Sequence, residues 1–537
     1  MNSSLLSFVR VGFVSVCTLL TTAAFAPTAA AAERVLHRSG TDDPTTIDPH
    51  KVAYPGETTV MSDLFVGLAA LDAAGKAVPG CAESWQVSPD GMRWTFRLRP
   101  DLKWSDGTSL RAEEFVWSMR RALDPGTAFP YAGRMFSIKN ARAVATGKLG
   151  VAELGVRAPD ARTVVIELEH PTPYLPEVVA TFGLPVPRAR IEKFGSDWVQ
   201  SGNFANNGPF TLERWSPNSS MRLKKNRFFY DAANVQLDAV VHYPVSQPMT
   251  ALRRFAAGEF DFTMAVPPDQ LDWVARNAPR ALRSSPGLGV EVLAFNTRSG
   301  PTRDVRVRRA LSLALDRDSL ARSVLGDARL AAWNFVPPVT TDYPRGALPE
   351  YHDWPLAQRR AEAKRLLEAA GFGPGTPLTL RLAFPANDFN KRIAVVLDAM
   401  WRQIGVRAQL ESKEQRSLAA TIVSGDFDAV RQLWLGGYSD ALAFLERFDG
   451  SAAGTTVNPT GYRNAKFDGL LRQAEAEVDI NRRAALLRQA ETLVVADQPA
   501  MPIYFFVSRR LVSPQLTGWT DNPRGIHVSR FMRVPAR

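Results

Sequence analysis

Apolar residues follow two different patterns along the chain, and the pattern changes near residue 290. In the first half, apolar and polar positions alternate in short segments, as at Trp94, Phe96 and Leu98, which is typical of half-buried strands. One helical face runs from Phe115 to Leu123, and the turn residues 124–126 end it. These features predict an α+β first half built on antiparallel strands.

After residue 290 the apolar positions recur with a helical period, and short strands separate the helices. A strand over 378–384 leads into a helix that carries apolar residues from 393 to 404, and a further strand follows at 406–410. This order is a βαβ unit, for which parallel strands and a right-handed connection are expected. The apolar segment 429–435 is predicted to add a strand to the same sheet.

Two Gly residues, Gly436 and Gly437, end that last strand, and a helix is predicted to begin near Leu442. No side chain projects from these two α-carbons, so another backbone can come close to them. A peptide could therefore pair with the strand by β-augmentation, in the crevice at the carboxyl ends of the parallel strands. The alternative is a core strand that simply ends in a turn.

Two local predictions concern helix boundaries. The apolar segment 58–71 is read as helical. Asp318 is placed to cap a short helix that ends at Gly326.

The first 32 residues have the order of a secretory signal. They contain one charged residue, Arg10, followed by an apolar run and then Ala-rich sequence, which places cleavage before Glu33. The apolar run is short for a membrane-spanning helix, and the bulky Val16 argues against lipidation at Cys17. The exported chain would then keep only Cys81, which we expect to be a small buried hydrophobe without a disulfide partner.

Charge and motifs narrow the function classes. The chain has 65 basic and 54 acidic residues, and loss of Arg10 leaves 64 against 54, or +10. The arginines are spread without a basic block, so nucleic-acid binding is not indicated. The six histidines form no metal-ligand pair, and no serine-hydrolase motif occurs. We therefore expect neither an enzyme nor a bound cofactor or metal.

Several motifs together resemble the periplasmic oligopeptide-binding proteins, the extracellular solute-binding proteins of family 5 that feed peptide ABC importers. The similarity covers nearly the whole mature chain. The motifs are residues 47–51, 64–68, 79–85, 94–99, 103–108, 207–210, 304–309, 314–317 and 369–372.

The resemblance implies an α/β fold of the large, three-domain periplasmic-binding-protein type, in which two lobes close over a ligand about a hinge. Residues 33–65, 185–288 and 506–537 would form the core of lobe I, 66–184 an additional domain packed on it, and 289–505 lobe II. We expect the chain to cross between the lobes near residues 289–295 and 504–508. The N- and C-terminal segments would share one lobe.

The resemblance also implies a ligand site. Leu433 and Leu435 would pair with a peptide through their main chains, and Arg431 matches a family arginine near the ligand's carboxylate end. Gly437 stands where the family usually carries an aspartate that binds the ligand's α-ammonium, so little preference for free over N-acetylated peptides is expected, and Gly437→Asp should create one. The implied ligand-binding residues are Tyr54, Pro55, Asn390, Gln415, Arg431, Leu433, Trp434, Leu435, Gly436, Gly437, Tyr438 and Asp440.

The resulting hypothesis is a monomeric periplasmic receptor that delivers peptides, or a peptide-like solute, to the membrane subunits of an ABC importer. One alternative keeps the receptor role and changes the solute to a modified or cell-wall peptide, an opine, a sugar or a metal chelate. A second alternative, from another class, is a secreted hydrolase. The positive charge and the missing aspartate are compatible with an acidic or N-blocked ligand.

Overall fold

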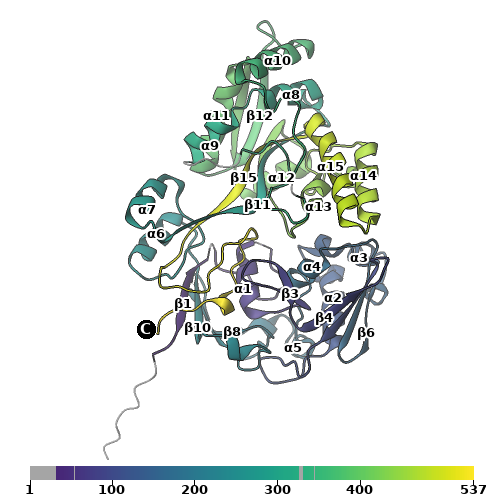
Figure 1. Cartoon of the computed structure of the whole chain (residues 1–537), viewed down its shortest axis with the longest axis vertical. Helices are drawn as coiled ribbons and strands as arrows, with labels where there is room; N and C mark the ends of the chain where they lie inside the picture. Colours follow the sequence, from purple (N-terminus) through teal and green to yellow (C-terminus); the bar gives the residue numbers. More distant parts are fainter. Residues whose placement is uncertain (1–31, 41, 54, 326–330, 344, 537) are drawn as a thin grey trace, which may run out of the picture.

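The computed structural model describes residues 32–40, 42–53, 55–325, 331–343 and 345–536. Residues 1–31 of the proposed signal segment, Tyr54 and Gly326 lie outside these ranges. The chain forms two lobes, one above the other in Figure 1, and each lobe contains both helices and sheets. The predicted two-lobed α/β fold is confirmed.

The first lobe holds a four-stranded sheet in the order β1-β10-β9-β8. Strand β1 (Val35–Ser39) pairs in parallel with β10 (Ala239–Tyr243), and antiparallel pairing continues to β9 (Ser220–Lys225) and β8 (Phe210–Ser216). Helix α1 (Pro55–Leu64) lies against this sheet and contributes Leu64, which is fully buried.

A second four-stranded sheet in the same lobe is antiparallel throughout. Its order is β4-β5-β7-β6, formed by Ala82–Val87, Arg93–Leu98, Thr163–Glu167 and Val156–Asp160. Helix α2 (Ala112–Leu123) packs on β6 and β7 through the apolar face that its sequence predicts. The expected antiparallel first half is therefore present, with only the β1–β10 pair parallel among these two sheets.

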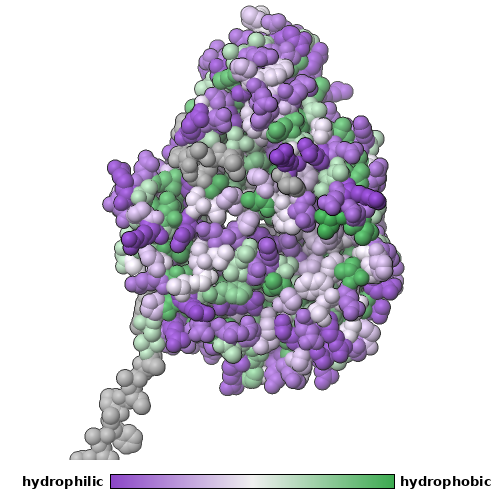
Figure 2. Space-filling view, in the orientation of Figure 1, coloured by the Kyte–Doolittle hydropathy of each residue, from purple (hydrophilic) through white to green (hydrophobic). Residues whose placement is uncertain are grey.

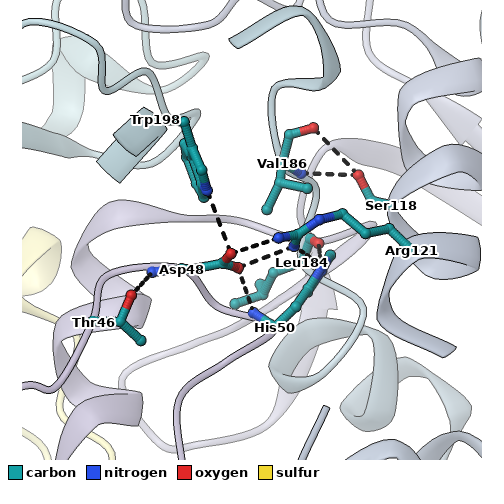
Figure 3. A network of polar contacts seen from close by, with 8 residues as sticks. All are labelled: Thr46, Asp48, His50, Ser118, Arg121, Leu184, Val186 and Trp198. Carbon is teal, nitrogen blue, oxygen red and sulfur yellow. Dashed lines mark hydrogen bonds and ion pairs between the residues drawn. The ribbon is translucent and has the colours of Figure 1, made fainter. Parts of the chain in front are cut away.

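A buried polar network joins α2 to the segment that follows β1 (Figure 3). Arg121 on α2 donates to both carboxylate oxygens of Asp48, at 3.1 and 2.6 Å, and to Nδ1 of His50 at 2.8 Å. Because a guanidinium only donates, Nδ1 of His50 accepts, and its Nε2–H is free to donate to the carbonyl oxygen of Leu184 at 3.0 Å. The indole Nε1 of Trp198 also lies 3.4 Å from Asp48. These contacts fix the neutral tautomer of His50, and burial lowers its pKa to about 4.

The second lobe is organised around a five-stranded mixed sheet in the order β13-β12-β14-β11-β15. Strand β12 (Leu378–Pro385) pairs in parallel with β13 (Val406–Lys413), after helix α11 (Asp388–Arg402), as the βαβ pattern predicts. Strand β14 (Ala429–Leu435) lies next to β12 and is parallel to it. The prediction that residues 429–435 join this sheet is therefore confirmed.

Two long antiparallel strands connect the lobes. Strand β11 (Leu282–Phe295) pairs with β15 (Ala500–Leu511) on both sides of an interruption between Pro286 and Val290. Within the interruption, the amide of Leu288 donates to the carbonyl oxygen of Pro523 at 2.7 Å. The ladder thus has two paired ends and an irregular middle.

The C-terminal segment returns to the first lobe, where the C-terminus lies beside β1 (Figure 1). Arg38 on β1 donates to the carbonyl oxygen of His527 at 3.1 Å and to the hydroxyl of Ser529 at 2.7 Å. Asp63 on α1 accepts from the amide and the hydroxyl of Ser529. The two ends of the described chain therefore share one core.

Two local predictions were wrong. The helix expected over 58–71 ends at Leu64, and residues 69–71 form strand β2 (Ala69–Leu71), which pairs with β3 (Ala77–Pro79). A side chain at Gly67 would lie 2.2 Å from the carbonyl oxygen of Val179, so the chain there packs too closely for a regular helix surface. Helix α9 (Arg317–Leu325) is capped by Asp316, which accepts from the amide of Ser319 at 3.1 Å, whereas Asp318 lies inside the first turn.

The remaining helices cover the sheets and the ends of the lobes. Hydrophilic residues cover most of the face in Figure 2, and apolar residues occur there in small separate groups. In the described ranges no helix combines the length and apolarity needed to cross a bilayer. The other α-helices are α3 (Ala141–Ala145), α4 (Leu175–Thr181), α5 (Arg188–Phe194), α6 (Pro248–Ala256), α7 (Leu271–Asn277), α8 (Val305–Leu313), α9 (Arg317–Leu325), α10 (Leu356–Ala369), α12 (Gln415–Ser424), α13 (Leu442–Leu445), α14 (Ala465–Ala476) and α15 (Ile480–Asp497).

Candidate functional site

A cavity of about 730 Å³ lies between the lobes. The first lobe contributes α1, the loop around Met264, the segment around Tyr131 and the C-terminal segment 523–526. The second lobe contributes β14 and the start of α11, and the crossing strands β11 and β15 form the wall between them. A volume of this size accommodates a small organic solute or a short peptide.

Strand β14 supplies one wall of the cavity. Arg431, Leu433 and Leu435 all line it, and the two leucines are 41% and 37% exposed. Trp434 points to the opposite face of the sheet and is buried against Phe335 and Phe448. The alternation follows from strand geometry, in which successive side chains lie on opposite faces.

The main chain of β14 has an open edge beside the cavity. Antiparallel pairing with β11 continues from Ala429 to Leu435, whereas the parallel register with β12 stops at Val430. The amide of Gly436 donates to the carbonyl oxygen of Leu288 at 3.0 Å, so even-numbered residues of β14 direct their main-chain groups toward β11. The N–H and C=O groups of Leu433 therefore point the other way, beyond the end of β12. This is the geometry that a further strand requires.

Arg431 is held by side chains of three neighbouring elements. Its guanidinium lies 3.1 Å from the carboxylate of Glu291 on β11, 3.3 Å from the hydroxyl of Tyr504 on β15, and donates to the side-chain oxygen of Asn390 on α11. Burial raises the pKa of Glu291, and the nearby Arg431 opposes that shift. The structure thus brings two predicted site residues together, with their charge balanced by a carboxylate of the protein itself.

The cavity wall near Gly437 contains two arginines from the first lobe. A side chain on Gly437 would begin 3.2 Å from Nε of Arg134, and the carbonyl oxygen of Gly437 accepts from Arg524 at 2.9 Å. Arg134 pairs with Glu446 at 2.7 Å, and Arg524 pairs with Glu177. Burial opposes the charge of Arg134, but Glu446 together with Tyr438 and Tyr131 outweighs this and raises its pKa. Both arginines line the cavity.

The same end of the cavity contains direct contacts between the lobes. The rings of Tyr174 and Tyr438 stack with centroids 4.0 Å apart, and the amide of Ser439 donates to Glu177 at 2.8 Å. Within the second lobe, the hydroxyls of Thr341 and Ser439 contact each other at 2.9 Å. Side chains of the protein alone therefore hold this end together.

Gly436 is required for packing within the protein. A side chain there would lie 2.9 Å from Leu288 and 3.0 Å from Phe444, and its φ is not positive. The expectation that this glycine leaves room for a ligand backbone is therefore corrected. The space above Gly436 is occupied by the crossing strand and by α13.

Four predicted site residues do not line the cavity. Gln415 is the exposed first residue of α12, and Trp434 is buried in the second lobe. Tyr438 faces Tyr174, and Asp440 forms a buried pair with Arg483 at 2.5 Å while accepting from the amide of Leu442 at 2.8 Å.

The other predicted site residues are of two kinds: six line the cavity, and two lie at or beside an undescribed position. Asn390, Arg431, Leu433, Leu435, Gly436 and Gly437 all line the cavity. Tyr54 lies outside the described residues, and Pro55 is the first residue of α1.

Sequence reasoning missed most of the first-lobe wall. Arg134, Arg524 and Glu291 come from segments without a motif, and they meet only because three distant parts of the chain converge. Phe505 and Phe506, which also line the cavity, lie on β15 within the crossing expected near residues 504–508. Within the described ranges, no three His, Cys, Asp or Glu side chains are grouped as a metal site.

Arg510 on β15 is a buried cation in the cavity wall. Its Nε donates to the hydroxyl of Ser508 at 3.1 Å and its Nη2 to the carbonyl oxygen of Gly525 at 2.7 Å, while Nη1 has no hydrogen-bond partner. Burial, with a smaller contribution from Arg38, lowers the pKa of Arg510 to about 9, which the carboxylate of Asp521 only partly offsets. Such a group is costly to bury without an anion.

Comparisons with known proteins agree with this arrangement. Residues 76–456 match the model of the bacterial extracellular solute-binding proteins, family 5. The chain is 34% identical over 512 residues to the periplasmic murein peptide-binding protein MppA of Escherichia coli K12, covering 94% of each chain. The solved structure of that Escherichia coli protein gives a TM-score of 0.84 and covers 94% of this chain and 98% of the other.

Two further relatives differ in what their names say they bind. The probable deoxycholate-binding periplasmic protein YgiS of Escherichia coli K12 is 35% identical over 531 residues, covering 98% of each chain. The structure of Haemophilus influenzae OppA in complex with RPPGFSPFR has a TM-score of 0.83 at 30% identity, covering 94% of this chain and 99% of that one.

Proposed function

Because the chain belongs to the bacterial extracellular solute-binding proteins of family 5, we propose that it is a periplasmic receptor for a peptide or peptide-like solute. The solute binds between the lobes, and the loaded receptor, acting as a monomer, delivers it to the membrane subunits of an ABC importer. The relatives named above are periplasmic binding proteins, and one has been solved with a bound peptide.

The observation that carries the proposal is the open edge of β14 inside the interlobe cavity. Leu433 directs its main-chain groups away from β11, past the end of β12, where an extended peptide could pair with them. Main-chain pairing accepts many side chains, which suits a receptor for peptides of varied sequence. The interruption of the β11–β15 ladder between Pro286 and Val290 supports a division of the chain near 288 and 506, with β11 and β15 as the hinge.

A non-peptide solute is the second candidate, because the cavity is lined largely by apolar groups. Phe182, Phe389, Leu435, Phe505 and Phe506 surround it. An apolar molecule such as a bile acid would bury its rings against them. The hydrolase alternative has no observation in its favour, and peptide turnover measured with the purified protein would establish it.

The proposal is tested by replacing Leu433 with proline. Proline removes one N–H, and at this position the lost donor faces the cavity, so the β11 ladder is kept. We expect binding of a peptide that co-purifies with the protein to weaken about tenfold or more, because one buried main-chain hydrogen bond is lost and its partner is left unsatisfied. Titration calorimetry with the peptide identified by mass spectrometry measures the change.

The matched control is Leu433→Ala, which removes the exposed side chain and keeps the N–H. Its loss of affinity measures the side-chain contact alone, so the proline variant should bind about tenfold more weakly than the alanine variant, and thermal unfolding should show both variants folded. Equal affinities of the proline variant and the wild type would exclude pairing at β14. Release of a solute without peptide bonds would favour the second candidate.

A further inference from the structure

The charges in the cavity wall are strongly unequal. One carboxylate, Glu291, lines the cavity among the described residues, and it is already within 3.1 Å of Arg431. The arginines that line the cavity are Arg134, Arg431, Arg509, Arg510 and Arg524. A solute in this cavity therefore meets a wall of net positive charge.

The arrangement around Gly437 strengthens this asymmetry. Arg134 and Arg524 line the cavity, whereas their partners Glu446 and Glu177 do not. The two carboxylates lie behind the wall, where Glu446 accepts from the hydroxyl of Tyr438 at 3.3 Å. An ammonium group brought to Gly437 would meet two guanidinium groups before it reached a carboxylate. Like charges at such distances repel, and desolvation adds to the cost.

Arg510 supplies the complementary feature, a cation that lacks an anion. Its nitrogen Nη1 is buried without a hydrogen-bond partner, and within the described ranges no carboxylate lies within ion-pair distance of its guanidinium. Its Nη2 donates to Gly525, in the same segment that carries Arg524. Both arginines are therefore attached to one short stretch of the first-lobe wall.

Taking the proposed function as its basis, we propose that the solute is an anion with an apolar body and no free ammonium group. Its acidic group binds at Arg510, where a carboxylate supplies the missing acceptor. Arg134 and Arg524 exclude an ammonium from the Gly437 end. The apolar body lies against Leu433, Leu435 and the phenylalanines of β15. N-acylated peptides and bile-acid-type amphiphiles share this chemistry.

Matched probes test the proposal on the full mature protein after denaturation and refolding, which removes co-purified solute. One tetrapeptide of apolar residues is made in four forms, with a free or acetylated amine and with an acid or amide at the other end. Calorimetry at constant salt gives each Kd, and deoxycholate is the fifth probe. We expect acetylation to leave the affinity unchanged or improve it, and amidation to weaken binding tenfold or more.

Variants identify the residue responsible. Arg510→Gln should reduce the acid-over-amide preference to less than threefold, whereas Arg283→Gln should leave it intact. Arg283 is the control because it lies opposite Arg510 in the β11–β15 register and is exposed outside the cavity. Thermal unfolding of the ligand-free variants separates binding from structure. A binding role predicts a melting temperature of Arg510→Gln no lower than that of the wild type, because a buried cation without an anion is removed.

The outcomes distinguish the proposal of an anionic solute from the proposal of a peptide receptor. Tightest binding by the free-amine, amidated peptide would overturn the anion proposal and leave the peptide receptor intact. Binding of deoxycholate without any peptide would support the anion proposal and overturn peptide recognition. Failure of all five probes would count against both. A lower melting temperature for Arg510→Gln with an unchanged acid preference would assign Arg510 to structure alone.

Discussion

Gly437→Asp tests the reading of the cavity most directly. The family resemblance alone leads to the expectation that an aspartate here restores recognition of a free α-ammonium. The structure leads to a different result, because the new Cβ would lie 3.2 Å from Nε and 3.4 Å from Cζ of Arg134. The carboxylate would therefore reach the guanidinium of Arg134 before it reached a ligand.

The magnitude follows from this separation. Two unit charges about 4 Å apart attract by about 4 kcal/mol at an effective dielectric constant of about 20. Desolvation, and the existing pair between Arg134 and Glu446, reduce this to a net gain of about 1–3 kcal/mol, typical of a charge-assisted hydrogen bond. An aspartate held in this way contributes little to an ammonium, so Gly437→Asp should change the free-over-acetylated preference less than about threefold.

A double-mutant cycle provides the decisive assay. Gly437→Asp, Arg134→Gln and the double variant are titrated with one free and one acetylated peptide. We expect the preference of the double variant for the free amine to exceed the product of the single effects by about tenfold, or about 1.4 kcal/mol. A tenfold preference in Gly437→Asp alone would refute the reasoning, because Arg134 would then leave the new aspartate free.

Two further predictions concern stability. Gly436→Val should lower the free energy of unfolding by about 1–3 kcal/mol through overpacking, whereas Gly375→Val, at an open position with no contact within 4 Å, should have little effect in the same denaturant titration. The free energy of unfolding should also fall as pH drops from about 6.5 to about 4, because the unfolded chain then binds a proton that neutral, buried His50 does not. At about 1.4 kcal/mol per pKa unit the His50 share is about 3 kcal/mol. The dependence of the free energy of unfolding on pH also includes contributions from His242 and His527. His50→Asn should reduce this dependence, and an unchanged dependence would contradict the assigned tautomer of His50.

The second-lobe sheet could be predicted because its signals are local. The helical period before Gly405 and the apolar strands on either side determine a βαβ unit without reference to distant residues. Leu433 and Leu435 were predicted from the family resemblance, and strand alternation agrees by assigning them to one face. Burial of Cys81 also agrees with its small apolar neighbours, and burial raises its pKa to about 12.

The first-lobe wall could not be predicted because it is assembled from distant segments. Arg134 and Arg524 are nearly 400 positions apart, and neither lies in a recognisable sequence motif. Gly436 illustrates the same limit. A side chain at this position would collide with Leu288, which lies on the crossing strand β11 and is distant in the sequence. Asp440 stands out in the sequence as an acidic residue close to the strand end. Its partner is Arg483, however, and only the folded chain brings these two residues together.

The direct contacts between the lobes have a kinetic consequence. Arg134 with Glu446, Arg524 with the carbonyl oxygen of Gly437 and the stacked Tyr174–Tyr438 rings hold the lobes together without any solute. A solute can then enter only the open fraction of molecules, and its apparent dissociation constant is its intrinsic value divided by that fraction. At high solute concentration the observed binding rate reaches a plateau equal to the rate of opening. Weakening one of these contacts would speed capture and release together, so these interlobe contacts set the pace at which the receptor can be loaded and emptied.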